Sequence, residues 1–256
     1  MAPSPVHRHS MTRNIGSDQR ETRIQRHTMT QPTMTNTRIE QDGLGAVEVP
    51  EDVWFGAQTQ RAIENFPVNG QPTTGDYPEL IQAFLSIKRA AAQLNHEIGL
   101  ITEAQTQAIE HACDQIMSAS MYDQFPVHYL HGGGGTSVNM NVNEVVSNIG
   151  EEWLGGKRGE HHHLHPNDQV NLNQSTNDTY PTACHLAVLL GWQALRPVFT
   201  ALQTSLTEKA TALKEQRRLA RTCLQDAVDI TFGAFFGGYQ ALITRCEKRI
   251  DDSVQA

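Results

Sequence analysis

Two stretches of the sequence place hydroxyl and amide side chains where a helix is expected to begin. In residues 131–144, HGGGGTSVNMNVNE, four glycines lead into Thr136 and Ser137. A second polar cluster lies just before Pro181 and contains Ser175, Thr176, Asn177 and Asp178. A helix start presents unpaired N–H groups and the positive end of the helix dipole, so it favours a bound anion. Uncharged donors at such starts predict a carboxylate ligand.

Each stretch also has an ordinary structural interpretation. The glycines can form a turn capped by Thr136, and no Gly-Lys-Ser/Thr follows them, so they are not a P-loop. One of the four polar residues before Pro181 would suffice as an N-cap. A third stretch, RTCLQDA at residues 221–227, is also interpreted as a junction that leads into a helix, because Arg221 and Thr222 lie at a break between two helical patterns. The residues alone favour a surface turn there.

A run of histidines suggests a metal site at first sight. Its members are His161, His162, His163 and His165. No Cys or Glu partner pattern accompanies the run, and no HExxH sequence is present. We therefore expect a solvated loop, with His165 packed by Pro166, and predict no metal and no cofactor.

Helical periodicity dominates the chain from residue 57 onward. Apolar residues recur at steps of three and four, and the resulting stripes are expected to form the core. The predicted helices span residues 57–65, Glu79–Glu97, Ala104–Ser118, Asn139–Leu154, Pro181–Gln216 and Phe232–Val254. Thr102 is the expected N-cap of the third helix, and Pro197 is expected to kink the fifth. Residues 38–56 are expected to be extended and turn-rich.

These elements predict an all-α fold in which a small N-terminal helical domain is followed by the start of a long-helix bundle. The expected boundaries are a tail at 1–37, the small domain at 38–178 and the partial bundle at 179–256. The Arg-rich, polar tail is interpreted as disordered or extraneous, with a mitochondrial transit peptide as the alternative. A helix of ~35 residues is about 50 Å long and needs an apolar partner along its length. We therefore expect the chain either to form oligomers or to lack a C-terminal half.

Composition limits the possible partners. The 256 residues carry a formal net charge of −8, which argues against a general nucleic-acid-binding surface. No apolar run approaches the ~18 residues of a membrane span, so neither a nucleic acid nor a membrane is expected as a partner. The four cysteines, at 113, 184, 223 and 246, have long and irregular spacing. They are interpreted as reduced, mostly buried thiols, which favours a cytoplasmic location.

From Arg38 to the end, the chain resembles the aspartase/fumarase superfamily. Seven motifs come in the order and spacing of that family: RIEQDGLGAVEVP, FGAQTQRAIENF, DQFPV, GGGGTSVNMNVNEVVSNIG, HPNDQVN, QSTNDTYPTA and RTCLQDA. The forms GTSVNMN and QSTND are similar to the aspartase (ammonia-lyase) branch, where fumarases tend to carry GTQSNMN and QSSND. HPND is closer to the fumarase form.

The resemblance implies a carbon–nitrogen lyase that converts L-aspartate into fumarate and ammonia by anti-elimination. A base removes a C3 proton, and the carbanion is stabilised as an aci-carboxylate before the amine leaves. Because that proton is very weakly acidic, preorganised donors are needed, and each can contribute ~3 kcal/mol in the transition state. The implied substrate is a small dicarboxylate.

Carried over residue by residue, the resemblance assigns Thr136, Ser175 and Thr176 to the β-carboxylate. Asn177 would meet the amino group, and Thr222 would meet the α-carboxylate side. A second tier of candidate residues comprises Ser137, His165, Asn167 and Cys223. Cys223 stands where the family has a histidine, and a thiol is a poor carboxylate donor. Asp229, Ala234 and Phe235 also depart from the family pattern.

The family's catalytic serine lies on a mobile loop that reads GSSxMPxKxNP, and no such sequence occurs in these 256 residues. The resemblance therefore assigns no catalytic residue to this chain. The family site is assembled from three subunits of a tetramer, which implies a homo-oligomer. We expect the N-terminal half of a cytoplasmic enzyme, with residues 38–178 as its N-terminal lyase domain and 179–256 as part of its central bundle. The alternatives are a fumarate hydratase and a catalytically inactive remnant or interaction module.

Overall fold

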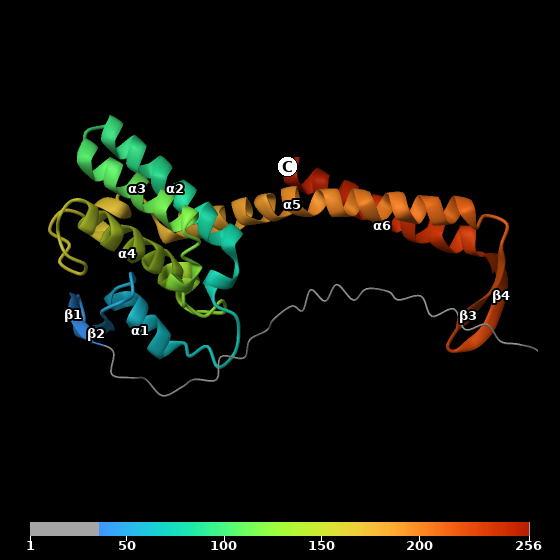
Figure 1. Cartoon of the computed structure of the whole chain (residues 1–256), viewed down its shortest axis with the longest axis horizontal. Helices are drawn as coiled ribbons and strands as arrows, with labels where there is room; N and C mark the ends of the chain where they lie inside the picture. The colour runs from blue at the N-terminus through green and yellow to red at the C-terminus, as the bar shows by residue number, and fades with distance from the viewer. Residues whose placement is uncertain (1–35, 256) are drawn as a thin grey trace, which may run out of the picture. The chain divides into compact units, whose positions relative to one another are not determined.

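A computed structural model describes residues 36–255, and its elements are labelled in Figure 1. The strands are β1 (Thr37–Asp42), β2 (Gly45–Pro50), β3 (Arg217–Thr222) and β4 (Gln225–Thr231). The α-helices are α1 (Ala57–Asn65), α2 (Pro78–Glu97), α3 (Glu103–Ser118), α4 (Thr136–Trp153), α5 (Thr176–Ala212) and α6 (Phe232–Gln255). Short 3₁₀ turns are η1 (Thr74–Asp76), η2 (Tyr122–Gln124) and η3 (Gly133–Gly135), and η4 (Pro166–Val170) is a π-turn.

The mostly helical fold confirms the predicted class. The expected tail at 1–37 lies outside the described residues except for its last two, and Thr37 already belongs to β1. Strands β1 and β2 form an antiparallel hairpin in the region expected to be extended and turn-rich, with Thr37 paired to Pro50 and Asp42 to Gly45. Thr102 caps α3 as predicted, because its hydroxyl accepts a hydrogen bond from the Gln105 amide N–H at 3.2 Å.

Two long helices begin earlier than the periodicity predicted. Helix α4 begins at Thr136, and the three glycines before it all have positive φ, which glycine adopts without strain. Helix α5 begins at Thr176 and continues through both Pro181 and Pro197. Neither proline therefore marks the end of a helix, although each removes one backbone donor.

Residues 217–231 contradict the expectation of a simple break between helices. They form the antiparallel hairpin β3–β4, in which Arg217 pairs with Thr231 and Thr222 with Gln225 (Figure 1). Its two turn residues, Cys223 and Leu224, both have positive φ. Two successive residues of this kind are typical of a type I′ hairpin turn, whose usual Asn-Gly signal is missing here.

The core lies among α2, α3, α4 and the first turns of α5. Large side chains without solvent exposure include Phe84, Leu85, Ile109, Ile116, Phe125 and Val138. Helix α4 is buried on almost every side, so its polar residues must find partners inside the protein. These are Asn139, Asn141, Asn143, Glu144, Ser147, Asn148 and Glu151. One of these buried side chains, Asn139, forms a hydrogen bond with Thr176 at the start of α5.

Helices α5 and α6 pack against each other. The indole N–H of Trp192 donates to Asp251 at 3.0 Å, and Arg196 forms an ion pair with the same carboxylate at 3.0 Å. The expectation that every apolar stripe forms core is wrong for α5 in a single chain. Val188 and Val198 are 64% and 60% exposed, because α2 and α6 cover only part of the helix.

Two further expectations are tested by the described residues. Only Cys113 is buried, whereas Cys184 and Cys246 are half-buried and Cys223 is exposed, so the expectation of mostly buried thiols is wrong. All four thiols are free. Within residues 36–255, no helix has both the length and the apolar character needed to cross a membrane.

Candidate functional site

The start of α4 presents the first candidate hydroxyl at the surface. Thr136 is exposed, and its Oγ1 donates to the Gly133 carbonyl at 2.8 Å. Ser137 is half-buried in the same turn. To donate to a ligand, the Thr136 hydroxyl must exchange the Gly133 carbonyl for a carboxylate oxygen.

The start of α5 presents the second group. Ser175 is the N-cap, and its Oγ accepts a hydrogen bond from the Asn177 N–H at 3.2 Å. Ser175 and Asn177 are exposed, and Thr176 is half-buried. Ordinary capping therefore accounts for Ser175 alone, which leaves the side chains of Thr176 and Asn177 without a capping role.

Two contacts bring these helix starts together. Gly135, directly before α4, lies so close to Tyr180 of α5 that an added Cβ would be 2.3 Å from the ring. Asn139 of α4 donates through Nδ2 to Oγ1 of Thr176 at 3.3 Å. The structure thus joins the starts of α4 and α5, at which Thr136, Ser175 and Thr176 lie.

Sequence reasoning missed Lys88, which connects to this corner from inside the protein. Lys88 has no solvent exposure, and its Nζ donates to the Oδ1 of Asn139 at 2.8 Å and of Asn171 at 3.1 Å, and to the Oε1 of Gln174 at 2.9 Å. Burial lowers the pKa of Lys88 to about 7. A signal was present in the sequence, because Lys88 falls on the buried stripe of α2, four residues after Phe84.

The structure does not bring Thr222 to the other hydroxyls within one chain. Thr222 is exposed at the end of β3, beside the turn of the β3–β4 hairpin, and not at a helix start. The 37 residues of α5, about 55 Å of helix at 1.5 Å per residue, separate that hairpin from Ser175. The prediction that Thr222 sits at a helix start is therefore wrong, and the surface turn favoured by the residues alone is correct. Cys223 is exposed in the same turn.

The histidine loop is only partly solvated. His162 and His163 are exposed, but the His161 ring is half-buried, with its Nδ1 3.1 Å from Ser147 Oγ, and burial lowers its pKa. Buried Glu151 holds the loop by accepting N–H bonds from His162 at 3.0 Å, from His163 at 2.9 Å and from Leu164 at 2.7 Å. No cluster of three or more metal-ligating side chains occurs in the part of the chain that the structure describes.

His165 and Asn167 belong to a second corner, around η4. The Nδ1 of His165 accepts the N–H groups of Asn167 and Asp168, both at 3.2 Å, so His165 caps η4. Pro166 beside it is buried. A cavity of about 270 Å³ lies here, and its lining includes His161, His165, Asn167, Glu40 and Glu144. The two carboxylates disfavour an anionic ligand in this cavity.

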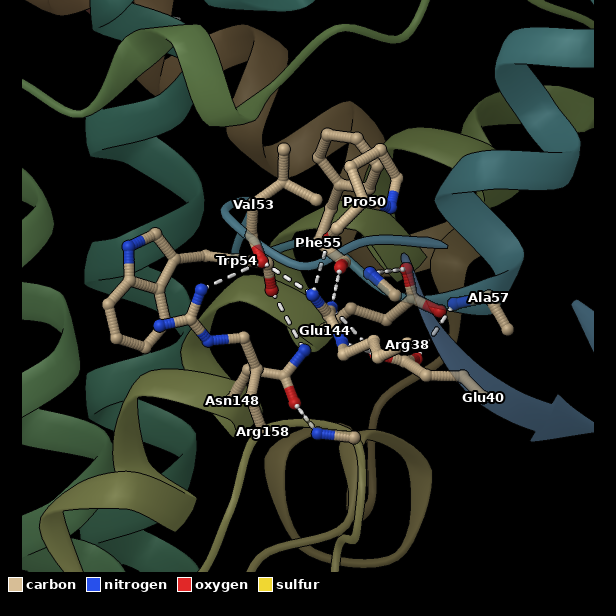
Figure 2. A network of polar contacts seen from close by, with 12 residues as sticks. Arg38, Glu40, Pro50, Val53, Trp54, Phe55, Ala57, Glu144, Asn148 and Arg158 are labelled. Atoms are coloured by element: carbon tan, nitrogen blue, oxygen red, sulfur yellow. Dashed lines mark hydrogen bonds and ion pairs between the residues drawn. The ribbon is translucent and has the colours of Figure 1, made fainter. Parts of the chain in front are cut away.

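Glu40 and Glu144 have a structural role at the start of α1 (Figure 2). Glu144 accepts the N–H groups of Gly56, Gln58 and Thr59 at 2.7–3.0 Å and the Thr59 hydroxyl at 2.6 Å. Glu40 accepts the Ala57 N–H at 3.0 Å. Burial nevertheless raises the pKa of Glu144 to about 7. The two carboxylates satisfy the free donors of this helix start, which is therefore occupied by the protein itself.

The same network fixes the segment that leads into α1. Arg38 donates to the carbonyls of Pro50, Val53 and Phe55 at 2.6–2.9 Å and pairs with Glu40. The guanidinium of Arg158 lies 3.7 Å from the centre of the Trp54 ring, and Asn148 donates to the Trp54 carbonyl at 2.8 Å (Figure 2). This segment is anchored to α4 by satisfied polar contacts, so it forms a support and not an open binding surface.

Comparisons with known proteins agree on one family. A family model described as "Lyase" matches residues 45–256. The class II fumarate hydratase of Oceanobacillus iheyensis is 39% identical over 219 residues, which cover 85% of this chain and 47% of that protein. The aspartate ammonia-lyase of Escherichia coli K12 is 41% identical over 221 residues, which cover 86% of this chain and 46% of that protein.

Solved structures give the same result. A structure described as fumarate lyase:delta crystallin from Brucella melitensis matches with a TM-score of 0.79 and 40% identity, over 86% of this chain and 51% of that one. A class II fumarase from Schistosoma mansoni matches with a TM-score of 0.77 and 32% identity, over 86% of this chain and 46% of that one. The chain spans about half the length of the relatives it matches.

Proposed function

Because this chain belongs to the lyase family that contains the aspartases and the fumarases, we propose that it binds a four-carbon dicarboxylate at the starts of α4 and α5. The reaction proposed is the conversion of L-aspartate into fumarate and ammonia. The observation that carries the proposal is the pairing of the two helix starts through Asn139 and Thr176. It gathers exposed hydroxyls and two helix dipoles in one corner.

Hydroxyl groups suit this chemistry because the intermediate carries more negative charge than the substrate. Removal of a C3 proton leaves a carbanion whose charge moves onto the neighbouring β-carboxylate. The C2–N bond then breaks, and the electron pair of the former C3–H bond forms the double bond of fumarate. Thr136, Ser175 and Thr176 would donate to the β-carboxylate, and Asn177 would contact the departing amine. Donors fixed before the reaction stabilise that charge without reorganisation.

The base that removes the C3 proton is not assigned to this chain, which contains no GSSxMPxKxNP sequence. The α-carboxylate would be met by Thr222 from a second copy, because α5 separates Thr222 from the other hydroxyls of its own chain. A homo-oligomer is therefore part of the proposal. Ser137 would support the same turn as Thr136.

A fumarate hydratase is the second candidate, and two observations favour it. Relatives named as class II fumarate hydratase match about as well as those named as aspartate ammonia-lyase. The HPND sequence at His165 is also closer to the fumarase form. The leaving group would then be water, and the carboxylate contacts would stay the same.

The proposal is tested by following fumarate through its ultraviolet absorbance. The 256-residue chain, alone and with an added segment that supplies the serine loop, is incubated with L-aspartate and separately with L-malate. We expect fumarate from L-aspartate only when the added segment is present. Fumarate from L-malate alone would favour the hydratase, and no fumarate from either mixture would contradict lyase function. Rapid turnover by the unaided chain would show that the base lies within these 256 residues.

A further inference from the structure

We propose that Lys88 is a positioning residue, which orients the Thr176 hydroxyl so that it donates to a bound carboxylate. This inference rests on the proposed function, since it concerns a hydroxyl assigned there to the substrate. Lys88 does not reach the surface, so it cannot touch the ligand itself. It acts through the side-chain amide of Asn139, which lies between Lys88 and Thr176.

The three acceptors around Lys88 match the donors of a protonated amine. An ammonium group has three N–H donors and no acceptor. The amide oxygens of Asn139, Asn171 and Gln174 accept from it at 2.8, 3.1 and 2.9 Å. Among residues 36–255, no carboxylate pairs with Lys88. The cluster is therefore built from neutral oxygens, so the Lys88 ammonium, when protonated, has no charged partner inside the protein.

This arrangement fixes which way the Asn139 amide faces. Because the protonated amine of Lys88 can only donate, the oxygen of Asn139 must point towards it, and the NH₂ group must point away. That NH₂ group donates to Asn171 Oδ1 at 3.0 Å and to Thr176 Oγ1 at 3.3 Å. Lys88 thus fixes the orientation of the Asn139 amide, and this amide makes the hydroxyl oxygen of Thr176 a hydrogen-bond acceptor.

The consequence for Thr176 follows from its single proton. Its oxygen already accepts from Asn139, so its own O–H must donate elsewhere, and no residue between 36 and 255 accepts it. Thr176 is half-exposed at the first residue of α5. The O–H is therefore free for an anion at the surface, where the positive end of the helix dipole favours it.

Two substitutions disturb this chain of donors in different ways. Lys88→Met removes the ammonium group and keeps a side chain of similar length. Asn139→Asp gives Lys88 a carboxylate partner, but it turns the Thr176 hydroxyl inward, because an ionised carboxylate can only accept. A purely structural role for Lys88 predicts that the Asn139→Asp variant binds as well as the parent chain. Arg89→Met is the control, since it removes a neighbouring positive charge that is paired with Asp114 and does not touch the amides.

The experiment measures succinate binding to the 256-residue chain by calorimetry, in parent and Thr176→Val backgrounds. Lys88→Met and Asn139→Asp should each weaken binding about 10-fold or more in the parent background. In the Thr176→Val background each should change binding less than about 2-fold, because the hydroxyl they orient is gone. Arg89→Met should have little effect in either. Equal losses in both backgrounds would overturn the proposal, because they would show that Lys88 acts by charge or packing alone.

A second readout separates this proposal from the proposed function. If the parent chain binds no succinate, the proposed function fails. The NMR resonances of the Asn139 side-chain NH₂ group then test whether Lys88 positions Thr176. Lys88→Met and Thr176→Val should each shift these resonances, and resonances unmoved by both substitutions would overturn it. If Lys88→Met does not fold, Asn139→Asp carries the same test.

Discussion

Gly135, the residue before α4, lies directly against the ring of Tyr180 in α5. A Cβ at Gly135 would be 2.3 Å from Cγ of that ring, and the backbone φ there is +94°. This close approach is the packing contact that holds the two helix starts together. It depends on the absence of a side chain at one position of the glycine run.

Replacing Gly135 by alanine should therefore push the two helix starts apart. We expect Gly135→Ala to lower the free energy of unfolding by about 2 kcal/mol or more, because the left-handed backbone and the ring contact both oppose a Cβ. Urea unfolding measures the loss. Gly134→Ala is the matched control, since its φ is +60° with nothing within 4 Å of an added Cβ, and it should cost only about 1 kcal/mol. Equal losses for the two variants would argue against the contact.

Replacing Glu144 by glutamine should destabilise the fold through the start of α1. The carboxylate accepts four hydrogen bonds. The NH₂ group of a glutamine is itself a donor, so it would face these N–H and O–H donors without bonding to them. We expect Glu144→Gln to lower the free energy of unfolding by about 3 kcal/mol. Glu48→Gln, on an exposed position of β2, should leave the urea midpoint unchanged. A neutral result for Glu144→Gln would mean that these bonds contribute little.

Lys88 should make stability depend on pH above neutrality. Its pKa is lowered to about 7 in the folded chain, against an ordinary value of 10.5. Between these values the unfolded chain binds more protons than the folded chain, so stability should rise with pH. The Cys113 thiol that faces Lys88 has its pKa raised to about 12 by burial, so it stays neutral over this range. Urea unfolding from pH 6 to 10 should show this rise in the parent chain relative to Lys88→Met, whereas parallel curves would contradict it.

The exposed apolar face of α5 should support association of two or more copies. Val188 and Val198 are both more than half exposed on α5. We expect sedimentation velocity to show an oligomer, and Val198→Glu to shift it towards the monomer because a charge would be buried without a partner. Thr204→Glu, at an exposed polar position of the same helix, is the control. A parent chain that sediments as a monomer would remove the second copy from the proposed site.

Much of the fold could be predicted from local patterns. Helical periodicity located the six α-helices of residues 36–255. Thr102 was correctly predicted as an N-cap because its partner Gln105 lies only three residues further along the chain. The β3–β4 hairpin was missed because Cys223 and Leu224 adopt positive φ without the Gly or Asn that usually signals such a turn. The early start of α5 was missed because Pro181 resembles a first-turn residue, whereas Ser175 is the N-cap.

The candidate site was only half predictable for a similar reason. Thr136, Ser175 and Thr176 stand out because hydroxyls cluster at helix starts, which is a local feature of the sequence. Lys88 does not stand out, because its partners come from residues 51, 83 and 86 positions further along the chain. Such a role depends on tertiary packing, and only its place on the buried stripe of α2 hinted at it.

The most direct test of the account is whether the hydroxyls at the two helix starts bind a dicarboxylate. Calorimetric titration of the 256-residue chain with succinate should give millimolar or tighter binding, and Thr176→Val should weaken it about 10-fold or more. Superimposable titrations of the parent chain and Thr176→Val, or no heat of binding from the parent chain, would contradict the account.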